Sequence, residues 1–428
     1  MTCKTILAIT VVALIAGCSS TRRAERNYIV TLKNTSSSER ADELVVLSRA
    51  AIEEKTGKLQ EGRYVTVTDR EGKPVAVQQD DLDKDGMWDE VAFLYKVEPG
   101  EKTSVRISST TPPPAGGVAR AHVRMRKKVN GNSFGPQLDS VTVPGNTAPT
   151  DFTKQKLPPY LTEGPAWEND KVAFRVYMDT RNIKDIFGKR TPAMLMDTVG
   201  TDPSNSYHKY ADWGMDILAV GKSLGAGSLA LKIPLANKDT LVRIGGANVG
   251  TITYEKVADG PVRAILRMHY RNWRVLPGIA PVDVTEEISI WGGKYYYESK
   301  VTVTNAPAGT QLVAGIVNLK NLQLKQVDVG LVKVLYTYGV QSDNNDQLGL
   351  AIMVPRNQFL NAAATPNAGS DILNTYTVLM PLTSTPATFR FVAGWEMSSL
   401  LFTNEENFLR YLQHEAENYA NGVEVRIR

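Results

Sequence analysis

The chain has 428 residues, of which 42% are hydrophobic, 8% aromatic and 22% charged. This composition is that of a globular protein, and it excludes a wholly disordered chain, a collagen and a coiled coil. The formal net charge is only +4, from 49 basic and 45 acidic residues. A charge this small and this evenly spread argues against a nucleic-acid partner.

The N-terminus has the pattern of a bacterial signal peptide. One lysine precedes an apolar run, residues 5–16, which is too short to span a bilayer. The run ends in Leu14-Ile15-Ala16-Gly17-Cys18, which resembles the lipobox of bacterial lipoproteins. We therefore expect residues 1–17 to be removed and Cys18 to be lipidated, with a plain secretory signal as the alternative. The predicted location is the bacterial cell envelope, on the periplasmic or outer face of the outer membrane, with residues 19–27 as a polar tether.

The next part of the chain, residues 28–110, predicts a small β domain. Short runs rich in β-branched and aromatic residues alternate there with turn residues, which is typical of all-β folds. Residues 41–55 are expected to hold a short helix. Residues 111–117 read Thr-Pro-Pro-Pro-Ala-Gly-Gly, the clearest linker in the chain, and predict a domain boundary.

The remaining segment, residues 118–428, is dominated by longer strand candidates. These lie at 262–270, 284–291, 294–304, 327–338 and 389–392. A weak helix is expected at 183–187 and a strong one at 404–419. For the strong helix, Thr403 and Glu406 have the spacing of a capping box, and an apolar stripe follows at helical spacing.

An acidic loop at residues 81–90 has the spacing of a calcium site. Carboxylates recur at every second position, a glycine at 86 permits a tight turn, and the loop joins two strand candidates. Its twelfth position is Ala92, where an EF-hand has glutamate. The pattern predicts a structural calcium ion, with a solvated acidic hairpin as the alternative, and its candidate ligands are Asp81, Asp83, Asp85 and Asp89.

The densest polar and aromatic segment is residues 207–216. A histidine titrates near neutral pH and can act as an acid or a base, which makes His208 the first catalytic candidate. Tyr207 is a second candidate for proton transfer, Trp213 offers a flat face to a sugar ring, and Asp212 can bind hydroxyl groups. The alternative is a buried polar network that fixes a loop.

Two arginine-bearing strands are candidates for binding a carboxylate. Alternation would put residues 175, 177, 179 and 181 on one face of a strand, and Arg181 is the candidate there. Arg263 is the first residue of a second basic strand face and is the carboxylate-binding candidate there. Tyr270 and Trp273, later in the same segment, are candidate aromatic residues for binding a sugar ring. Either face could instead be a plain solvent face.

Two further patterns leave alternatives open. Basic residues at 120, 122, 124 and 126 share one strand face, which suits contact with an acidic polymer or an exposed edge strand guarded by charge. Glu396 follows Trp395 after an apolar strand. This glutamate could be a buried general base or an acceptor for a sugar hydroxyl. The alternative is a capping residue beside a tryptophan of the core.

Together these segments carry a family resemblance. The stretches Asp81 to Glu90, Phe174 to Arg181, Tyr207 to Gly227 and Gly394-Trp395-Glu396 resemble an uncharacterised family of bacterial secreted lipoproteins from polysaccharide-degradation gene clusters. That family is similar to the galactose-mutarotase-like group. The resemblance implies an all-β fold with minor α content, in which residues 118–428 form a large antiparallel β-supersandwich beside the smaller N-terminal β domain. Because mutarotases of this group use a His acid and a Glu base, it also implies these roles for His208 and Glu396.

The leading hypothesis is a carbohydrate-active enzyme, a lyase or a glycoside hydrolase, acting on acidic, uronic-acid-containing glycans. In a lyase, Arg181 or Arg263 would neutralise the uronate. His208 or a tyrosine, Tyr207 or Tyr210, would transfer the proton. In a hydrolase, Glu396 and Asp212 would be the carboxylate pair. The alternative is a non-catalytic glycan-binding lipoprotein with Tyr207, Trp213, Tyr270 and Trp273 as stacking platforms. We expect a monomer whose other partner is the membrane, through Cys18.

Overall fold

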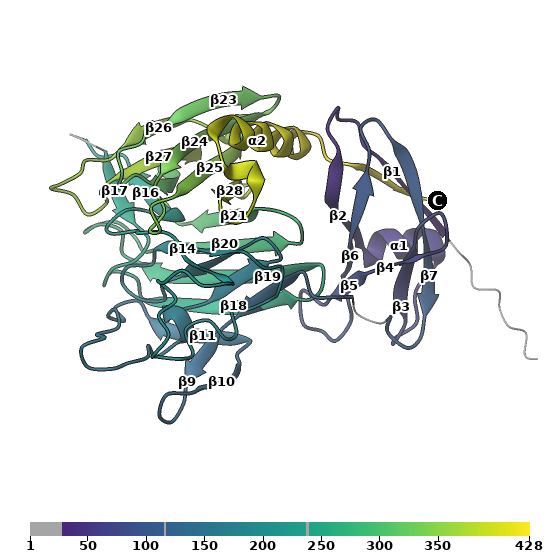
Figure 1. Ribbon diagram of the computed structural model, residues 1–428, viewed down its shortest axis with the longest axis horizontal. Coiled ribbons are helices and arrows are strands. Elements are labelled where there is room, and N and C mark those ends of the chain that lie inside the picture. Colours follow the sequence, from purple (N-terminus) through teal and green to yellow (C-terminus); the bar gives the residue numbers. More distant parts are fainter. Residues whose placement is uncertain (1–27, 115–116, 237–238) are drawn as a thin grey trace, which may run out of the picture.

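The computed structural model describes residues 28–114, 117–236 and 239–428, and it consists of two β-rich units that lie side by side (Figure 1). A large antiparallel β-sandwich stands beside a smaller β domain, so the predicted fold class is confirmed. The signal peptide, Cys18 and the tether at 19–27 lie outside the described residues. Within the described ranges, no helix has both the length and the apolar character that a membrane span needs.

The small domain is a sandwich of two antiparallel sheets with the strand orders β29-β1-β7-β3-β4 and β2-β6-β5. Its elements are β1 (Tyr28–Lys33), β2 (Arg40–Ser48), α1 (Arg49–Thr56), β3 (Tyr64–Thr68), β4 (Pro74–Val75), β5 (Val77–Asp80), β6 (Glu90–Val97), β7 (Lys102–Thr110) and β29 (Glu424–Ile427). Alternate apolar residues of both sheets form one core. The helix expected at 41–55 begins only at Arg49, because Val45 and Leu47 enter this core from strand β2 and Ser48 caps the helix.

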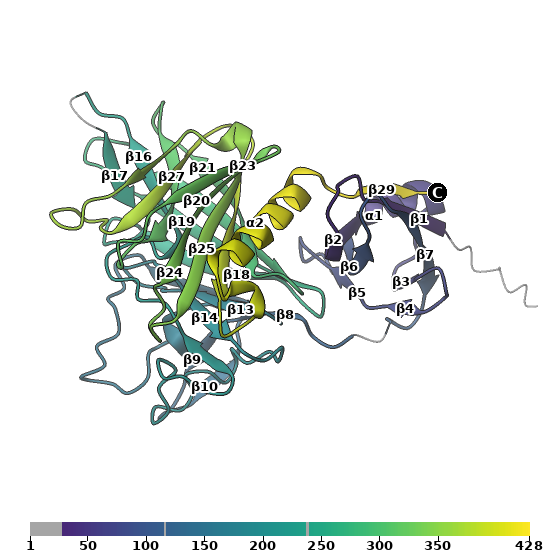
Figure 2. The same cartoon turned by 45° about the horizontal axis from the view of Figure 1, so that its top comes forward.

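Strand β29 comes from the other end of the chain. It pairs antiparallel with β1, and Ile427 lies opposite Val30. Figure 2 shows the chain leaving helix α2 (Glu405–Ala420) and crossing to the small domain. The prediction that 118–428 forms only the sandwich is therefore wrong for these last residues, since β29 completes the sheet of the N-terminal domain.

The large sandwich has a nine-stranded sheet on one side and two five-stranded sheets on the other. The nine-stranded sheet contains, in spatial order, β11 (Ser140–Pro144), β18 (Thr251–Asp259), β19 (Arg263–Trp273), β20 (Val282–Trp291), β21 (Tyr296–Thr304), β28 (Ala387–Trp395), β25 (Gln347–Pro355), β24 (Val332–Val340) and β23 (Lys325–Val329). The first five-stranded sheet, called the site sheet below, contains β15 (Gly214–Asp216), β14 (Lys184–Lys189), β13 (Val172–Val176), β12 (Ala166–Asn169) and β8 (Ala121–Arg124). The second contains β17 (Thr240–Arg243), β16 (Ala226–Ile233), β22 (Gln311–Val317), β27 (Thr375–Pro381) and β26 (Asn361–Ala364).

The core lies between these layers. Trp167 and Phe174 of the site sheet pack against Tyr297 and Phe391 of the nine-stranded sheet, with ring centroids 4.9–6.3 Å apart. The remaining elements are β9 (Arg126–Lys128), β10 (Phe134–Gln137) and the short 3-10 turns η1 (Leu161–Glu163), η2 (Arg356–Gln358) and η3 (Leu400–Phe402).

Helix α2 lies on the outer face of the nine-stranded sheet. Phe408, Leu412 and Ala416 are buried against it, so the strong helix prediction is confirmed. The N-cap is Asn404, whose side chain accepts a hydrogen bond from the Asn407 amide at 2.9 Å, and not Thr403 as the capping box suggested.

Two other secondary-structure predictions are wrong. Residues 184–187 belong to strand β14 and not to a helix, because Ile186 enters the core while Asp185 and Phe187 face outward, which is a period of two. Residues 327–338 form a hairpin of β23 and β24 and not one strand. Gly330, with a positive φ of 54°, makes the turn.

Candidate functional site

The outer face of the site sheet carries a row of charged side chains. Because strand residues alternate between faces, the core positions of Phe174, Ile186 and Met215 place their neighbours on the outer face. Arg175 lies directly opposite Asp185 in the register. Asp216 is on the next strand, β15.

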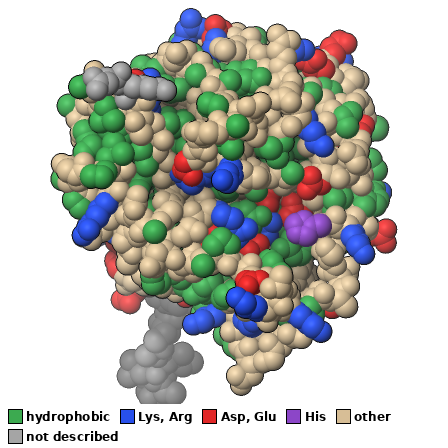
Figure 3. Space-filling view, turned by 90° about the vertical axis from the view of Figure 1, so that its left-hand side faces the viewer, with side chains coloured by type: hydrophobic (Ala, Val, Ile, Leu, Met, Phe, Trp, Pro, Cys, Tyr) green, Lys and Arg blue, Asp and Glu red, His purple; other side chains and the backbone are tan. Residues whose placement is uncertain are grey.

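Residues 190–213, called the covering loop below, fold over this face. An apolar cluster that joins Phe187 of the sheet to Met196, Tyr207 and Trp213 holds the loop down. The Asp216 amide also donates to the Tyr207 carbonyl at 2.9 Å. The loop thereby brings Tyr207 and His208 onto the charged row. Figure 3 shows that basic, acidic and histidine side chains lie close together on the side of the sandwich turned away from the small domain.

Arg175 is the centre of the charged row, and its side chain is fully buried. It donates to Asp185 at 2.7 Å, to Asp216 at 2.8 Å and to the hydroxyl of Tyr177 at 2.7 Å. It also donates to the Tyr207 hydroxyl at 3.1 Å. The guanidinium of Arg181 lies nearby, 3.8 Å from the centroid of the Tyr177 ring. Two guanidinium groups therefore share four carboxylates, those of Glu163, Asp179, Asp185 and Asp216.

Burial and the neighbouring charges shift the pKa values of the site. Burial and the neighbouring Asp185 raise the pKa of Asp216 well above its ordinary value. Burial and the positive charge of Arg175 lower the pKa of His208. Asp216 therefore keeps its proton to a higher pH than an exposed carboxyl group does, and His208 loses its proton at a lower pH than an exposed imidazole does.

His208 connects this buried carboxyl group to solvent. Its Nδ1 lies 3.4 Å from Asp216 Oδ2, and its side chain is 57% exposed. The imidazole also packs on the ring of Tyr207, with centroids 4.5 Å apart. Asp343, an exposed residue between β24 and β25, faces the same place. Although the residue as a whole is exposed, partial burial of its carboxyl group and repulsion by Asp185 raise the pKa of Asp343.

Backbone strain marks the edge of the same cluster. Thr162 and Glu163 in the turn η1 have positive φ angles of 48° and 63°. The Thr162 carbonyl accepts from Arg175 at 3.2 Å, and Glu163 Oε1 accepts from Arg181 at 2.6 Å. Strained residues of this kind persist where surrounding contacts hold them, and they are frequent at functional sites.

Three of the predicted site residues come together here, namely His208, Tyr207 and Arg181. Asp212 is exposed on the covering loop, and Trp213 packs on Phe187 with centroids 6.5 Å apart. Glu396 lies at the end of β28 and accepts from the Gln347 amide at 2.6 Å. Among the described residues it makes no hydrogen bond or ion pair with His208. The carboxyl group that His208 contacts in this structure is that of Asp216, and so the structure does not bring His208 and Glu396 together as a pair.

The three candidates on strand β19 are not part of this cluster. Arg263 is buried against the small domain, where it pairs with Asp80 and Glu90 at 2.6 Å. Tyr270 is an inward position of β19, and a register shift after it turns Trp273 inward as well. Both rings are buried in the core, so the prediction that they stack on sugars is wrong.

The basic row that begins at residue 120 holds the covering loop. Arg124 is fully buried and donates to the carbonyl oxygens of Leu161 and Met196. His122 bridges Asp197 of the loop and Asp259, at 3.1 and 3.0 Å. Burial opposes its charge, but the two carboxylates outweigh burial and raise its pKa to about 10. Although β8 is an edge strand, the side chains of His122, Arg124 and Arg126 contact other parts of the protein.

Two residues of the site, Glu163 and Asp343, lie outside every segment that the sequence analysis singled out. Both lie in turns without a recognisable motif, and only the fold brings them to the site sheet. Arg175, Asp185 and Asp216 lay inside or beside segments that drew attention, but they were not chosen. Arg175 could have been found from its alternation with Tyr177, which predicted that the two side chains share one face. The structure confirms this, because Arg175 donates to the Tyr177 hydroxyl.

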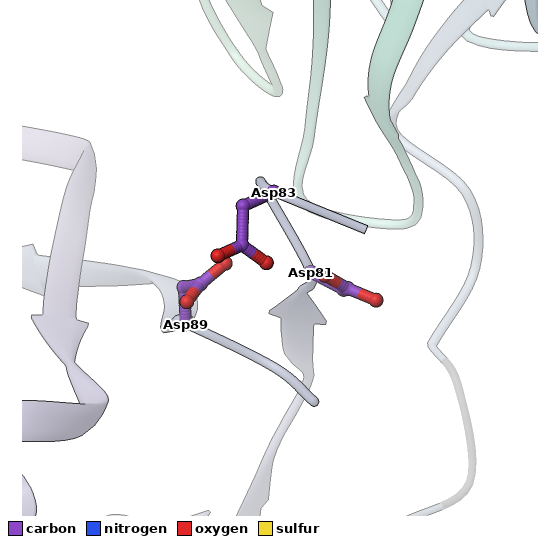
Figure 4. A group of neighbouring side chains, drawn as sticks. All are labelled: Asp81, Asp83 and Asp89. Carbon is purple, nitrogen blue, oxygen red and sulfur yellow. The ribbon is translucent and has the colours of Figure 1, made fainter. Parts of the chain in front are cut away.

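The acidic loop lies between strands β5 and β6, on the small domain. One carboxylate oxygen from each of Asp81, Asp83 and Asp89 lies within 4.8 Å of the others, and Figure 4 shows Asp83 and Asp89 facing each other. Asp81 Oδ1 is buried and has no hydrogen-bond partner among the described residues. Asp85 is outside this group, and its Oδ1 accepts from the Met87 amide at 2.7 Å. Carboxylate oxygens in this arrangement suit a calcium ion.

The comparisons with known proteins agree with this fold. The family model described as a domain of unknown function, DUF4861, matches residues 32–425. An uncharacterised protein, P7, of Formosa agariphila is 22% identical over 431 residues, covering 96% of both chains. Two solved structures from Enterococcus faecalis, an alpha-mannosidase and a protein of glycosyl hydrolase family 38, each align with a TM-score of 0.50, at 10% and 11% identity. They cover 94% of this chain, which spans only 46% and 47% of theirs, and they show the fold alone.

Proposed function

The chain belongs to the DUF4861 family, and we propose that it is a carbohydrate-active enzyme whose proton-transfer site lies on the outer face of the site sheet. One observation carries this proposal: the exposed His208 lies 3.4 Å from the buried carboxyl of Asp216, and the pKa of His208 is lowered while that of Asp216 is raised. Such a couple can take a proton from a hydroxyl group or give one to a leaving oxygen. The solved structures that share the fold include an alpha-mannosidase, which supports a glycan as the substrate class.

Each residue of the cluster has a distinct role in this proposal. His208 faces the substrate and transfers the proton, while Asp216 stores it. Arg175 is a positioning residue, because it holds Asp216 and the Tyr207 hydroxyl but is itself buried. Asp343 supplies the second carboxyl group, whose raised pKa suits an acid.

The charges of the site favour hydrolysis of a glycosidic bond over elimination. A lyase needs a free cation to neutralise the uronate carboxylate. Arg175 is buried, and Arg181, though 31% exposed, is already bound to Glu163 and Asp179. An acidic substrate would also meet the surplus carboxylates. The acidic glycans that the sequence suggested are therefore the second choice, and neutral glycans the first.

The test is an activity panel on residues 19–428 with neutral and uronic-acid polysaccharides. Reducing ends and the absorbance of unsaturated uronates are followed together. We expect reducing ends without absorbance, and a loss of at least about 100-fold in His208→Ala and Asp216→Asn. His269→Ala is the matched control, because this histidine contacts Glu255 and Thr285 on the nine-stranded sheet.

The other outcomes of this panel each decide something. A joint rise of both signals would establish elimination and give Arg181 the uronate. If His208→Ala kept its full activity, the proposed proton-transfer site would be refuted. If no polysaccharide is cleaved but the protein is retarded in a glycan gel, the non-catalytic glycan-binding alternative replaces the enzyme.

We also propose that the mature protein is a lipoprotein of the cell envelope, anchored through Cys18. The support is the sequence Leu14-Ile15-Ala16-Gly17-Cys18 after an apolar run. Labelled palmitate should enter the wild-type protein and not the Cys18→Ala variant, which should leave the membrane fraction. Labelling of both forms would refute the anchor.

For the acidic loop we propose a structural calcium ion held by Asp81, Asp83 and Asp89. The buried, unpartnered oxygen of Asp81 supports a cation there, since a buried carboxylate oxygen without a partner is costly. Calcium should raise the melting temperature of the protein, and Asp83→Asn should abolish the rise. Magnesium is the matched control ion, and an equal rise with both ions would argue against a specific site.

A further inference from the structure

A cavity of about 540 Å³ lies between the two domains, on the opposite side of the sandwich from His208. Its floor is the outer face of β18 to β21 and β28, and its roof comes from β2 and β6 of the small domain. Helix α2 closes one side with Glu415 and Asn418. The volume falls within the range of small-molecule sites, roughly 300–1,000 Å³.

The two domains are fastened to each other at this cavity. Arg263 of the floor pairs with Glu90 of the roof and with Asp80 at 2.6 Å. Gln78 of β5 also donates to the Arg263 carbonyl at 2.9 Å and accepts from its amide. The walls are therefore built from both domains and held in place by buried contacts, as a binding site requires.

The charges that line the cavity are balanced. The lining contains five cations and five carboxylates, and most of them face each other. Cross-strand ion pairs join Arg267 to Glu287 at 2.8 Å and Arg390 to Glu298 at 2.9 Å, and Lys294 pairs with Glu415 at 3.0 Å. A charged ligand would have to break one of these pairs, whereas hydroxyl groups can bond to their remaining oxygens and N–H groups.

One buried donor in the lining lacks an acceptor. Trp291 is only 6% exposed, and its Nε1–H has no hydrogen-bond partner among the residues that the structure describes. Tyr296 packs edge-on against the Trp291 indole, with centroids 5.3 Å apart. A buried N–H group is costly until an acceptor meets it. Because this nitrogen is itself shielded from solvent, a ligand oxygen would meet it only after the indole turns toward the cavity.

We propose that this cavity is a second glycan site, which binds an uncharged pyranose unit through its hydroxyl groups. The balanced ion pairs supply donors and acceptors in alternation, and the Trp291 N–H bonds a ligand oxygen. This site is separate from the proposed proton-transfer site, since the two lie on opposite outer faces of the sandwich. It would hold a glycan chain on the protein between successive reactions.

Calorimetry on residues 19–428 in the Asp216→Asn background tests this proposal. The probes are neutral hexasaccharides of mannose, glucose, galactose and xylose, with hexagalacturonate as the charged comparison. We expect at least one neutral probe to bind, and Ser289→Trp, which fills the cavity from its floor, to weaken that binding at least ten-fold. A probe that also occupies the His208 site would show two sites, and Ser289→Trp should remove one of them.

Two variants keep the test sharp. Thr302→Trp, an exposed position on β21 away from the lining, is the matched control and should bind as before. Trp291→Phe removes only the N–H group and should weaken binding several-fold even if Ser289→Trp fails to fold. Binding that survives both cavity variants would overturn the proposal, as would preference for hexagalacturonate or no neutral binding at all. Cleavage lost in His208→Ala with cavity binding retained would show that the two proposals stand separately.

Discussion

The two outer faces of the sandwich carry the same kinds of charged side chain in different ratios. On the site sheet, two arginines share four carboxylates, and the pKa of Asp216 rises well above its ordinary value through burial and the nearby Asp185. On the outer face of the nine-stranded sheet, Arg267 pairs with Glu287, Arg390 pairs with Glu298, and Lys294 pairs with Glu415 of helix α2. Burial would raise the pKa of Glu415, but Lys294 and His414 outweigh burial and lower it to about 2. The two faces therefore differ in the number of carboxylates that each cation meets.

The largest expected effect follows from removing a cation from each face. Arg175→Met leaves Asp185 and Asp216 buried without their guanidinium, and breaking a buried pair in this way costs about 3–5 kcal/mol of unfolding free energy. Arg267→Met breaks a partly exposed pair with Glu287, and should cost less than about 1 kcal/mol. Urea denaturation of both variants measures the difference. Equal losses would show that the faces do not differ as described.

The second test exchanges one carboxyl group on each face and gives opposite pH dependences. Glu415 has a lowered folded pKa, so its stabilisation, about 3 kcal/mol, is present above pH 4.5 and is lost as the pH falls toward 2. Glu415→Gln should therefore be less stable than wild type at pH 7, and the gap should close in acid. Asp216 has a raised folded pKa, so its stabilisation is lost as the pH rises above 3.8. The free energy of unfolding of Asp216→Asn should therefore rise relative to that of wild type between pH 4 and pH 8. Urea unfolding across this range measures the difference, and a difference that stayed constant would contradict the raised pKa.

Much of the fold could be predicted because it follows from local patterns. Alternating apolar residues and turn residues indicated the β class, and the apolar stripe at 404–419 indicated helix α2. Strand β29 could not be predicted, since its pairing with β1 joins residues nearly four hundred positions apart and its run of four residues is too short to stand out. Trp273 was misplaced because a register shift in β19, invisible in the sequence, reverses the face it should occupy.

The site was predictable only where residues of one segment act together. The residues 207 and 208 are neighbours in sequence and stay neighbours in the fold. Asp343 and Glu163 come from distant turns, and their role depends on how the sheets pack. Arg263 and Arg175 both head basic strand faces, and the sequence does not reveal that one of these faces meets the small domain and the other meets the covering loop.

A third test concerns the covering loop. This loop lies on the outer face of the site sheet, whereas helix α2 lies on the outer face of the nine-stranded sheet. The folded pKa of His122 is about 10, above the ordinary 6.5, so its stabilisation is present below pH 6.5 and lost as the pH rises through 10. Because Asp197 is half exposed, we expect about 2 kcal/mol from this contact. The stability difference between wild type and His122→Asn should shrink between pH 6 and pH 10. His269→Asn serves as the control on the other face, and an equally large pH-dependent gap there would remove the special role of the loop contact.

The smallest expected effect belongs to the cap of helix α2. Asn404→Ala removes the side-chain acceptor of the Asn407 amide, and N-cap losses of this kind cost about 1 kcal/mol. Thr403→Ala should cost less, because Thr403 lies outside the helix and its hydroxyl donates only to the Leu400 carbonyl. If Thr403 were the N-cap, as the capping box predicted, Thr403→Ala would be less stable than Asn404→Ala. Comparing the urea concentrations at which the two variants are half unfolded therefore identifies the capping residue. Neither variant should change the pH dependence of stability, because neither Asn404 nor Thr403 has a side chain that titrates.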